Sequence, residues 1–213
     1  MFSAIIFDID DTLVYYENLN IEEWYEEVCL PSCESLGIEI SLDDWNSLVS
    51  GKFSRDWPAK LGVNAKTFWK TIDEYNYKFR IKMGKQGRIK KYEDTDVLSK
   101  IDVKMIAYSV SSKKCAEFSL EITSLRKFFY SVYGKDLDNY KFLMELKPHG
   151  GLLREILRRE NISPSDCLVI GDSPRDYFAG IAAGCSAIIV DRENKYQGDF
   201  KKIENLWELI SLL

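Results

Sequence analysis

One stretch decides the fold of this 213-residue chain: Phe7-Asp8-Ile9-Asp10-Asp11-Thr12-Leu13. The stretch begins at the last residue of the segment 3–7, which is short, apolar and rich in Ile and Phe. This segment predicts a buried strand that stops at Asp8. In open α/β sheets, ligands bind at the carboxyl ends of the strands. Asp8 and Asp10 therefore stand where a functional site would form, although a pair of acids alone is also typical of a capped turn.

The second half of the sequence alternates between apolar runs and amphipathic segments. We predict strands at residues 103–108, 128–133, 167–170 and 187–190, and helices at residues 112–120, 148–159, 174–183 and 203–213. Strands that are apolar along their whole length, separated by helices, favour a parallel sheet covered on both faces. The fold class is therefore α/β, and the strand before Asp8 must join this sheet.

The segment between these two parts is helical. We predict one helix over residues 21–36, a second that begins after Ser41 as its N-cap, and a third over residues 64–80. The aromatic stripe of the third helix is more typical of helix packing than of a substrate site. The predicted organisation is an α/β core domain built from residues 1–14 and 96–213. An α-helical cap domain, residues 15–95, is inserted after the first strand.

Composition limits the function classes. The net charge of −5 argues against a dedicated nucleic-acid binder, although a metal and one lysine can make a local anion site on an acidic protein. No apolar run approaches the ~20 residues of a membrane span, and the first residues lack a basic flank, so no membrane partner and a cytoplasmic location are expected. Five cysteines, an odd number, predict buried thiols in a reducing compartment.

Further polar residues lie near the ends of the other predicted strands: Ser109 follows the strand at 103–108, and Asp172 and Asp176 follow the strand at 167–170. Lys147 stands in the segment just before the helix predicted from Pro148. Taken singly, each has a bland explanation as a loop residue, a surface lysine or a helix-capping acid. Together with Asp8 and Asp10 they make a set suited to phosphoryl transfer. Carboxylates bind Mg²⁺, one carboxylate can attack phosphorus, and a second acid can protonate the leaving group. The lysine and the hydroxyl would offset the charge of the transferred group.

With these motifs in order, the sequence resembles the haloacid dehalogenase superfamily, in the branch with a type-one helical cap and phosphoglycolate phosphatase-like activity. The resemblance spans essentially the whole chain and rests on four motifs: Phe7 to Leu13, Ser109, Lys147-Pro148, and Gly171-Asp172-Ser173-Pro174-Arg175-Asp176 with the following Ala182-Ala183-Gly184. It implies a parallel sheet flanked by helices and a helical cap inserted between the first two motifs.

The resemblance also implies roles for these residues. Asp8 would be the nucleophile and a metal ligand, and Asp10 the acid/base with its main-chain carbonyl on the metal. Asp172 would complete the Mg²⁺ ligands. The remaining roles would fall to phosphate-binding Ser109 and Lys147, and to the supporting residues Thr12 and Asp176. The dehalogenase branch lacks the second acid, so Asp10 favours a phosphatase or phosphotransferase.

Two positions depart from the family pattern. Val110 stands where a small polar residue is common, and Gly150-Gly151 replaces the usual continuation after Lys147-Pro148. His149, the only histidine, could reach the site or stand at an exposed helix start.

The cap carries a second candidate segment, Gly51-Lys52-Phe53-Ser54-Arg55, which resembles a polar segment that faces the active site in some relatives. Lys52 and Arg55 are candidates to contact an anionic part of the substrate; a solvated loop is the alternative. The leading function is Mg²⁺-dependent hydrolysis of a small phosphomonoester, phosphoglycolate-like or a sugar phosphate, through an aspartyl-phosphate. A phosphomutase and a non-catalytic phosphate-ligand sensor are the alternatives, and the oligomeric state is left open.

Overall fold

The protein is built on one parallel sheet, seen in a computed structural model that describes residues 2–135 and 140–213. Six strands lie in the order β5-β4-β1-β6-β7-β8, and every neighbouring pair is parallel. The strands are β1 (Ala4–Asp8), β4 (Lys104–Ser112), β5 (Ser131–Lys135), β6 (Cys167–Gly171), β7 (Ser186–Val190) and β8 (Lys202–Ile203). The predicted α/β class with a parallel sheet is confirmed.

The apolar character of β1 follows from its central place in the sheet. Ala4 and Ile6 pack into one hydrophobic core, whereas Ile5 and Phe7 pack into another on the opposite face. Side chains alternate between the two faces of a strand, so a strand covered on both sides needs apolar residues at every position. This is why the stretch before Asp8 contains no polar alternation.

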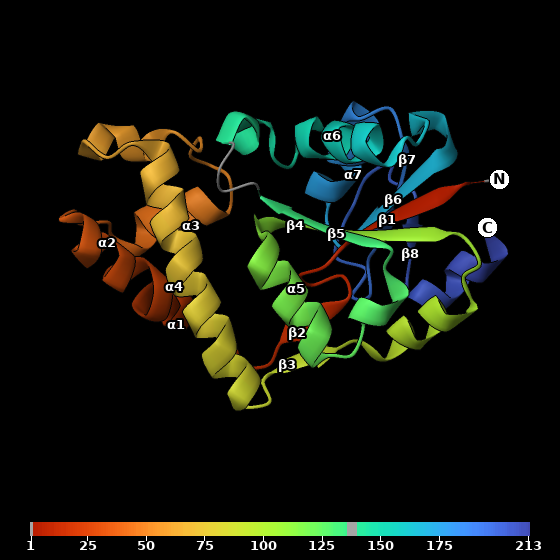
Figure 1. The fold of residues 1–213 in the computed structure, drawn as a ribbon, viewed down its shortest axis with the longest axis horizontal. Helices are drawn as coiled ribbons and strands as arrows, with labels where there is room; N and C mark the ends of the chain where they lie inside the picture. The colour runs from red at the N-terminus through yellow and green to blue at the C-terminus, as the bar shows by residue number, and fades with distance from the viewer. Residues whose placement is uncertain (1, 136–139) are drawn as a thin grey trace.

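Helices cover both faces of the sheet (Figure 1). Helices α6 (Gly151–Glu160) and α7 (Pro174–Ala182) contribute to the core that contains Ala4 and Ile6. Helix α5 (Lys113–Ile122) and a 3-10 helix at Leu206–Ser211 contribute to the other core. Shorter 3-10 turns lie at Arg126–Phe128, Tyr140–Glu145 and Pro164–Asp166.

The cap helices stand at the end of the sheet to which the strand arrows point (Figure 1). They are α1 (Ile21–Trp24), a π-helical turn (Tyr25–Cys29), α2 (Leu30–Leu36), α3 (Leu42–Val49), a 3-10 helix (Trp57–Leu61) and α4 (Ala65–Lys85). The predicted N-cap Ser41 accepts a hydrogen bond from the Asp44 main-chain N at 3.1 Å. Pro31 does not end the first helical segment: the helix runs without a break from the π-helical turn Tyr25–Cys29 into α2, and Pro31 stands just after this wider turn.

A short antiparallel ribbon connects the cap helices to the sheet. It consists of β2 (Val14–Tyr16) and β3 (Ile89–Lys91), and a 3-10 helix at Glu93–Lys100 follows. Sequence analysis did not predict this ribbon, because each strand has only three residues and shows no clear alternation. The chain enters the cap through β2 and leaves it through β3, so the ribbon places these two connecting segments side by side.

Several predicted elements differ from the structure. The strand predicted at residues 128–133 lies at Ser131–Lys135, and the helix predicted over residues 64–80 continues to Lys85. The strand predicted at residues 103–108 continues to Ser112 with a shift in register, so Ser109 lies inside β4. The helix predicted from Pro148 begins at Gly151, since the glycines at 150 and 151 weaken its start. The helix predicted at 203–213 is shorter, because Ile203 pairs with Val190 in the sheet and Asn205 caps the 3-10 helix that follows.

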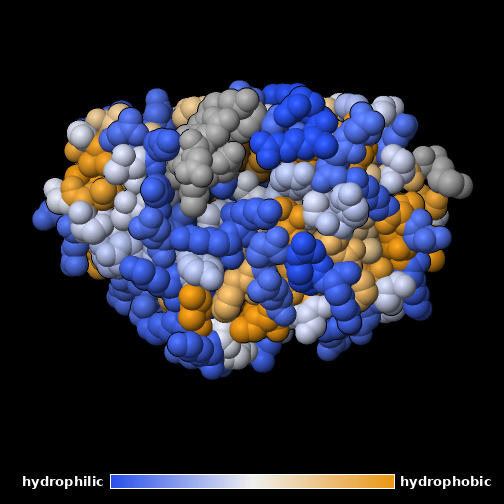
Figure 2. All heavy atoms as spheres, viewed as in Figure 1, coloured by the Kyte–Doolittle hydropathy of each residue, from blue (hydrophilic) through white to orange (hydrophobic). Residues whose placement is uncertain are grey.

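The predicted burial of the cysteines is confirmed, and one face of the molecular surface is largely polar. Figure 2 shows a face that is mainly hydrophilic, with small separate hydrophobic patches. All five cysteines are free thiols and buried. In the described part of the chain, no helix combines the length and the apolar character that crossing a bilayer requires.

Candidate active site

Asp8 occupies the carboxyl end of the central strand β1, between β4 and β6. The residue is almost fully buried, at 3% exposure. The chain turns immediately afterwards: Asp11 adopts φ +64°, and its main-chain N donates to the carbonyl of Val14 at 2.7 Å. This tight turn lets the Thr12 hydroxyl donate to Asp8 Oδ2 at 3.0 Å. One carboxylate oxygen of Asp8 is thus fixed by its own loop.

Lys147 reaches the other oxygen of Asp8. Its ammonium forms ion pairs with Asp8 Oδ1 and with Asp176 Oδ1, on the first turn of α7, and it lies 4.5 Å from the ring centroid of Tyr108. All three charged side chains are at most 9% exposed. Residues separated by up to 168 positions in sequence therefore meet at one edge of the sheet, as the strand-end argument predicts.

The site holds more negative than positive charge. Asp8, Asp172 and Asp176 offer carboxylate oxygens that all lie within 4.8 Å of one another. Burial raises the pKa of Asp8 well above its ordinary value, Lys147 opposes this, and the neighbouring acids add to the rise. Burial, and then Asp176, raise the pKa of Asp172 to about 7. Three hard oxygen donors around one point fit a divalent cation such as Mg²⁺, whose charge would relieve this repulsion.

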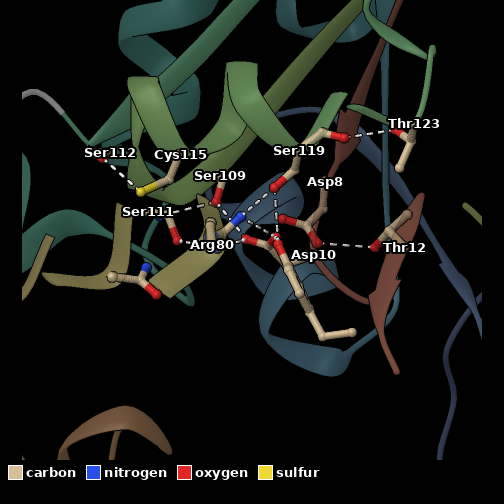
Figure 3. A network of polar contacts seen from close by, with 12 residues as sticks. Asp8, Asp10, Thr12, Arg80, Ser109, Ser111, Ser112, Cys115, Ser119 and Thr123 are labelled. Atoms are coloured by element: carbon tan, nitrogen blue, oxygen red, sulfur yellow. Dashed lines mark hydrogen bonds and ion pairs between the residues drawn. The ribbon is translucent and has the colours of Figure 1, made fainter. Parts of the chain in front are cut away.

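The Asp10 carboxylate is not part of the cluster of Asp8, Asp172 and Asp176, and it is held by a network of its own (Figure 3). Arg80 of helix α4 donates from Nη1 to Asp10 Oδ1 at 2.9 Å and from Nη2 to Oδ2 at 3.1 Å. Ser109 donates to Oδ2 at 2.9 Å, and the Tyr16 hydroxyl donates to Oδ1. Although burial acts in the opposite direction, the Arg80 guanidinium lowers the pKa of Asp10, so the carboxylate is ionised in this arrangement.

The structure therefore separates the predicted site residues into two groups. Asp8, Thr12, Lys147, Asp172 and Asp176 surround one centre. Asp10 and Ser109 contact each other through their side chains, and the Asp10 carboxylate is not a member of the acidic cluster.

Sequence analysis missed Arg80, the residue that connects Asp10 to the cap. Arg80 also donates to Ser119 Oγ at 2.8 Å and to Ser111 Oγ at 2.9 Å, and only 6% of it is exposed. The sequence did contain a pattern that could have pointed to Arg80: polar residues recur at helical spacing along α4. They are Asp73, Asn76 and Arg80, and all three are buried. Charged residues are rarely buried unless they are paired, so such a stripe within an apolar helix face predicts partners across an interface.

Three cavities lie between the cap and the sheet. The first, about 250 Å³, is lined by Arg55 and His149 and opens beside Lys147. The second, about 90 Å³, is lined by Arg55 and Trp45, and the third, about 200 Å³, by Asp10 and Arg80. Val110, one of the two departures from the family pattern, lines the second and third cavities and gives them an apolar wall. Lys52 is exposed and lines none of these cavities.

The arrangement supplies the groups that phosphoryl transfer needs. A carboxylate at Asp8 can act as a nucleophile, and the ammonium of Lys147 beside it can balance negative charge on an incoming group. A bound Mg²⁺ would supply further charge neutralisation and would hold phosphoryl oxygens. A second acid, Asp10, lies two residues from Asp8 with its own cavity.

Comparison with known proteins gives the family and the fold. Residues 5–190 match the family model described as haloacid dehalogenase-like hydrolase. Among solved structures, the chain is similar to CbbY from Rhodobacter sphaeroides in complex with phosphate, with 17% identity, a TM-score of 0.69, and coverage of 98% of this chain and 96% of that chain. It is also similar to a putative phosphoglycolate phosphatase from Lactobacillus plantarum, with 19% identity, a TM-score of 0.65 and full coverage of both chains.

A third similar structure is the putative hydrolase YfnB from Bacillus subtilis bound to magnesium, with 17% identity, a TM-score of 0.62, and coverage of 100% of this chain and 98% of that chain. At these identities the likeness establishes the fold. No curated protein matches the chain.

Proposed function

We propose that this chain, which belongs to the haloacid dehalogenase-like hydrolase family, is a Mg²⁺-dependent phosphatase that acts on a small phosphomonoester. The observation that carries the proposal is the position of Asp8 at the end of β1, with Lys147 on one carboxylate oxygen and Thr12 on the other. This arrangement fixes the proposed nucleophile, the Asp8 carboxylate, beside the Lys147 ammonium. The phosphate found with CbbY and the magnesium found with YfnB support the same type of ligand and ion at this fold.

The proposed reaction has two steps on Asp8. One carboxylate oxygen of Asp8 attacks phosphorus, the bond from phosphorus to the leaving oxygen breaks, and Asp10 gives a proton to that oxygen. Water then attacks the aspartyl-phosphate, Asp10 takes the proton from the water, and phosphate and the free Asp8 carboxylate result. Lys147 balances the charge on the phosphoryl oxygens in both steps, and Ser109 is the second phosphate-binding residue.

The metal would be held by Asp8 and Asp172 with the main-chain carbonyl of Asp10. Asp176 supports Lys147 through the ion pair between them. Asp8 and Asp172 fit the metal-binding role because their carboxylate oxygens converge within 4.8 Å of each other and of Asp176. When bound, Mg²⁺ supplies charge neutralisation at the phosphoryl oxygens.

The cap takes part in the proposed cycle through Asp10. In the present arrangement Asp10 is ionised and engaged by Arg80 and Ser109, whereas the first step needs a protonated Asp10 and a free Ser109 hydroxyl. A substrate that enters must therefore displace Arg80 from Asp10, which a movement of α4 would accomplish. Arg55 at the cavity wall would contact the leaving group of that substrate, and Lys52, which is exposed outside the cavity, would contact it only after a movement of its segment.

The test is turnover of p-nitrophenyl phosphate with and without Mg²⁺, compared between the native chain and Asp8→Asn. We expect Mg²⁺-dependent phosphate release that Asp8→Asn abolishes, and phosphate on Asp8 in acid-quenched native protein by mass spectrometry. Asp102→Asn, an exposed acid in the same half of the chain, is the matched control. Transfer of phosphate to an added sugar instead of water would indicate a mutase. The absence of turnover on a broad phosphoester panel would contradict the proposal in favour of a phosphate-ligand sensor.

A further inference from the structure

Arg192 follows strand β7 and reaches across the edge of the sheet to the loop that begins at Asp8. Its Nη2 donates to the carbonyl oxygen of Thr12 at 3.0 Å, and its Nη1 lies 3.5 Å from the carbonyl oxygen of Asp11. The Thr12 hydroxyl in turn donates to Asp8 Oδ2 at 3.0 Å (Figure 3). One residue therefore connects the Arg192 guanidinium to the proposed nucleophile, although β7 is not a neighbour of β1 in the sheet. Arg192 has no role in the mechanism proposed above.

Asp94 fixes the orientation of this guanidinium group. Arg192 donates from Nε to Asp94 Oδ2 at 3.0 Å and from Nη2 to Asp94 Oδ1 at 2.9 Å, and its guanidinium carbon lies 3.7 Å from the ring centroid of Tyr92. The ion pair is largely buried, with side-chain exposures of 20% for Arg192 and 10% for Asp94. Desolvation offsets much of the attraction in such a pair, whereas its bidentate geometry sets where the remaining donors point. The pair directs Nη2 at the Thr12 carbonyl.

The two partners of Arg192 belong to the segment by which the chain leaves the cap. Tyr92 directly follows β3, and its main-chain N donates to the carbonyl of Leu13 at 3.1 Å. Asp94 also accepts a hydrogen bond from the main-chain N of Leu206 at 3.0 Å. Arg192 therefore stands where the loop after β1, the segment after β3 and the C-terminal 3-10 helix meet.

The segment that carries Arg192 is itself anchored by the residue before it. The Asp191 carboxylate accepts hydrogen bonds from the main-chain N of Lys195 at 2.9 Å and of Tyr196 at 3.0 Å, and from Lys202 Nζ at 3.2 Å. Asp191 is only 3% exposed. Arg192 thus projects from a fixed turn.

The loop that Arg192 contacts needs such support. Asp11 adopts φ +64°, a left-handed conformation that costs energy for a residue with a side chain. The carbonyl oxygens that face Arg192 belong to Asp11 and to Thr12, the residue after it. A change in this turn would move the Thr12 hydroxyl and, with it, the Asp8 oxygen that the hydroxyl holds.

We propose that Arg192, oriented by Asp94, is a positioning residue for phosphoryl transfer: it holds the main chain at Thr12 so that the Thr12 hydroxyl keeps the Asp8 carboxylate aligned for attack on phosphorus. This inference rests on the proposed phosphatase function. Arg192 contacts neither the substrate nor the metal in this role. Its loss should therefore slow the transfer of the phosphoryl group to Asp8 and leave substrate binding unchanged.

The experiment measures single turnovers of p-nitrophenyl phosphate with Mg²⁺ and with the enzyme in excess. The rate constant of p-nitrophenolate release at saturating enzyme reports transfer to Asp8, and the half-saturating enzyme concentration reports substrate binding. A fraction of unfolded molecules does not change this rate constant. The variants are Arg192→Gln, Arg192→Lys, Thr12→Val and the double variant of Thr12→Val with Arg192→Gln. Thermal unfolding of every variant measures its stability.

Arg126→Gln is the matched control. Arg126 also donates to a carboxylate and to a main-chain carbonyl, those of Glu117 at 2.6 Å and Phe129 at 2.7 Å. It precedes β5 and therefore lies toward the amino ends of the parallel strands, away from Asp8.

Arg192→Gln should lower the rate constant by about 10- to 100-fold and change the half-saturating concentration less than about twofold, because the nucleophile is misplaced while binding is kept. Arg192→Lys keeps a charge opposite Asp94 but has no second arm for the Thr12 carbonyl, so its melting temperature should be closer to the native value while its rate constant stays at least about 10-fold low. Thr12→Val should also slow the transfer, and adding Arg192→Gln to it should cost less than about twofold more, because both act on the same oxygen of Asp8. Arg126→Gln should keep the native rate constant.

A native rate constant in Arg192→Lys, or in folded Arg192→Gln, would overturn the positioning role and leave Arg192 as a support of the fold alone. A weaker half-saturation with an unchanged rate constant would also overturn it, because Arg192 would then act on binding. Losses of Thr12→Val and Arg192→Gln that multiply in the double variant would show that Arg192 does not act through Thr12. In all these cases the native chain still hydrolyses p-nitrophenyl phosphate, so the proposed function stands. No turnover of any phosphoester by the native chain would overturn the proposed function and the positioning role together.

Discussion

Arg80 on cap helix α4 holds both carboxylate oxygens of Asp10 on the loop after β1, at 2.9 and 3.1 Å (Figure 3). This bidentate pair joins a residue of the cap to a residue proposed to move a proton. A bidentate guanidinium–carboxylate contact fixes the relative orientation of the two side chains as well as the distance between them. The same contact therefore fixes the position of α4 and keeps the Asp10 carboxylate from contacting a substrate.

The first prediction concerns the stability of this pair. Arg80→Met should lower the free energy of unfolding by about 2–3 kcal/mol, because it leaves the largely buried Asp10 carboxylate without its counter-charge. Asp10 keeps 23% side-chain exposure, which places the loss at the low end for a buried pair. The measurement is urea unfolding of Arg80→Met, Asp10→Asn and the double variant. The double variant should lose less than the sum of the single losses; additive losses would show that the two groups are not coupled.

A second prediction separates the proposed acid from the proposed nucleophile. Asp10→Asn should lower kcat/KM for an alkyl phosphate by about 10²–10⁴-fold, because an alkoxide leaving group needs a proton when the aspartyl-phosphate forms. The loss of kcat/KM on p-nitrophenyl phosphate should be much smaller, since p-nitrophenolate leaves without protonation; kcat, which includes hydrolysis of the aspartyl-phosphate with Asp10 as base, should fall for both substrates. Asp8→Asn should abolish turnover of both substrates. Equal losses of kcat/KM on both substrates in Asp10→Asn would contradict the acid role of Asp10.

The third prediction concerns the cation. Adding MgCl₂ should raise the melting temperature by about 5 °C at saturating concentration, because the ion relieves repulsion among Asp8, Asp172 and Asp176. NaCl at matched ionic strength should give almost no rise. In Asp172→Asn the rise with MgCl₂ should be lost and turnover with it. A rise of the same size in Asp172→Asn would place the cation elsewhere.

The fourth prediction is a pH dependence of stability at the far end of the sheet. Glu160 accepts hydrogen bonds from Lys104 at 2.6 Å, Ser131 at 2.6 Å and Tyr133 at 2.7 Å. Burial works against it, but these donors lower the pKa of Glu160 below its ordinary value. A carboxylate whose pKa is lower in the folded than in the unfolded state stabilises the fold when it is ionised. This stabilisation is fully present at pH values above the pKa of the unfolded state, and it is lost as the pH falls through the pKa of the folded state.

Glu160→Gln should therefore cost about 1–2 kcal/mol at pH 7 and much less at pH 3. Urea unfolding at both pH values measures this difference. Glu121→Gln, an exposed acid on α5, is the control and should show little cost at either pH. A cost for Glu160→Gln that does not change with pH would contradict the ionic contribution.

The fifth prediction tests how Asp176 is positioned. A Cβ at Gly171 would lie 2.2 Å from Cγ and 2.3 Å from Cβ of Asp176, so Gly171→Ala must displace that side chain. Turnover should fall by about 100-fold, because Asp176 holds Lys147 beside Asp8 and a displacement of about 1 Å is costly at a reacting centre. Gly84→Ala in α4 is the control, since its new Cβ meets only the ends of the Ile122 and Phe118 side chains. Full activity of Gly171→Ala would show that Asp176 is not needed in this position.

The sequence alone was sufficient for the parallel sheet and for the residues around Asp8. Strands that are apolar at every position must be buried on both faces, and the carboxyl ends of parallel strands meet at one edge. From these two rules Asp8, Lys147, Asp172 and Asp176 could be brought together although up to 168 positions separate them. The rules depend only on local pattern and on sheet direction, both of which the sequence displays.

The tertiary structure alone decided how the cap faces this site. That Arg80 holds Asp10, and that Arg55 and Arg175 meet in one cavity, depends on the packing of α4 and of the Ser50–Arg55 segment against the sheet edge. Packing between separate elements is set by side-chain shape and burial across an interface, and no spacing along the chain encodes which residues then meet. The sequence therefore determined which residues gather around Asp8, and the fold determined which residues of the inserted helices face them.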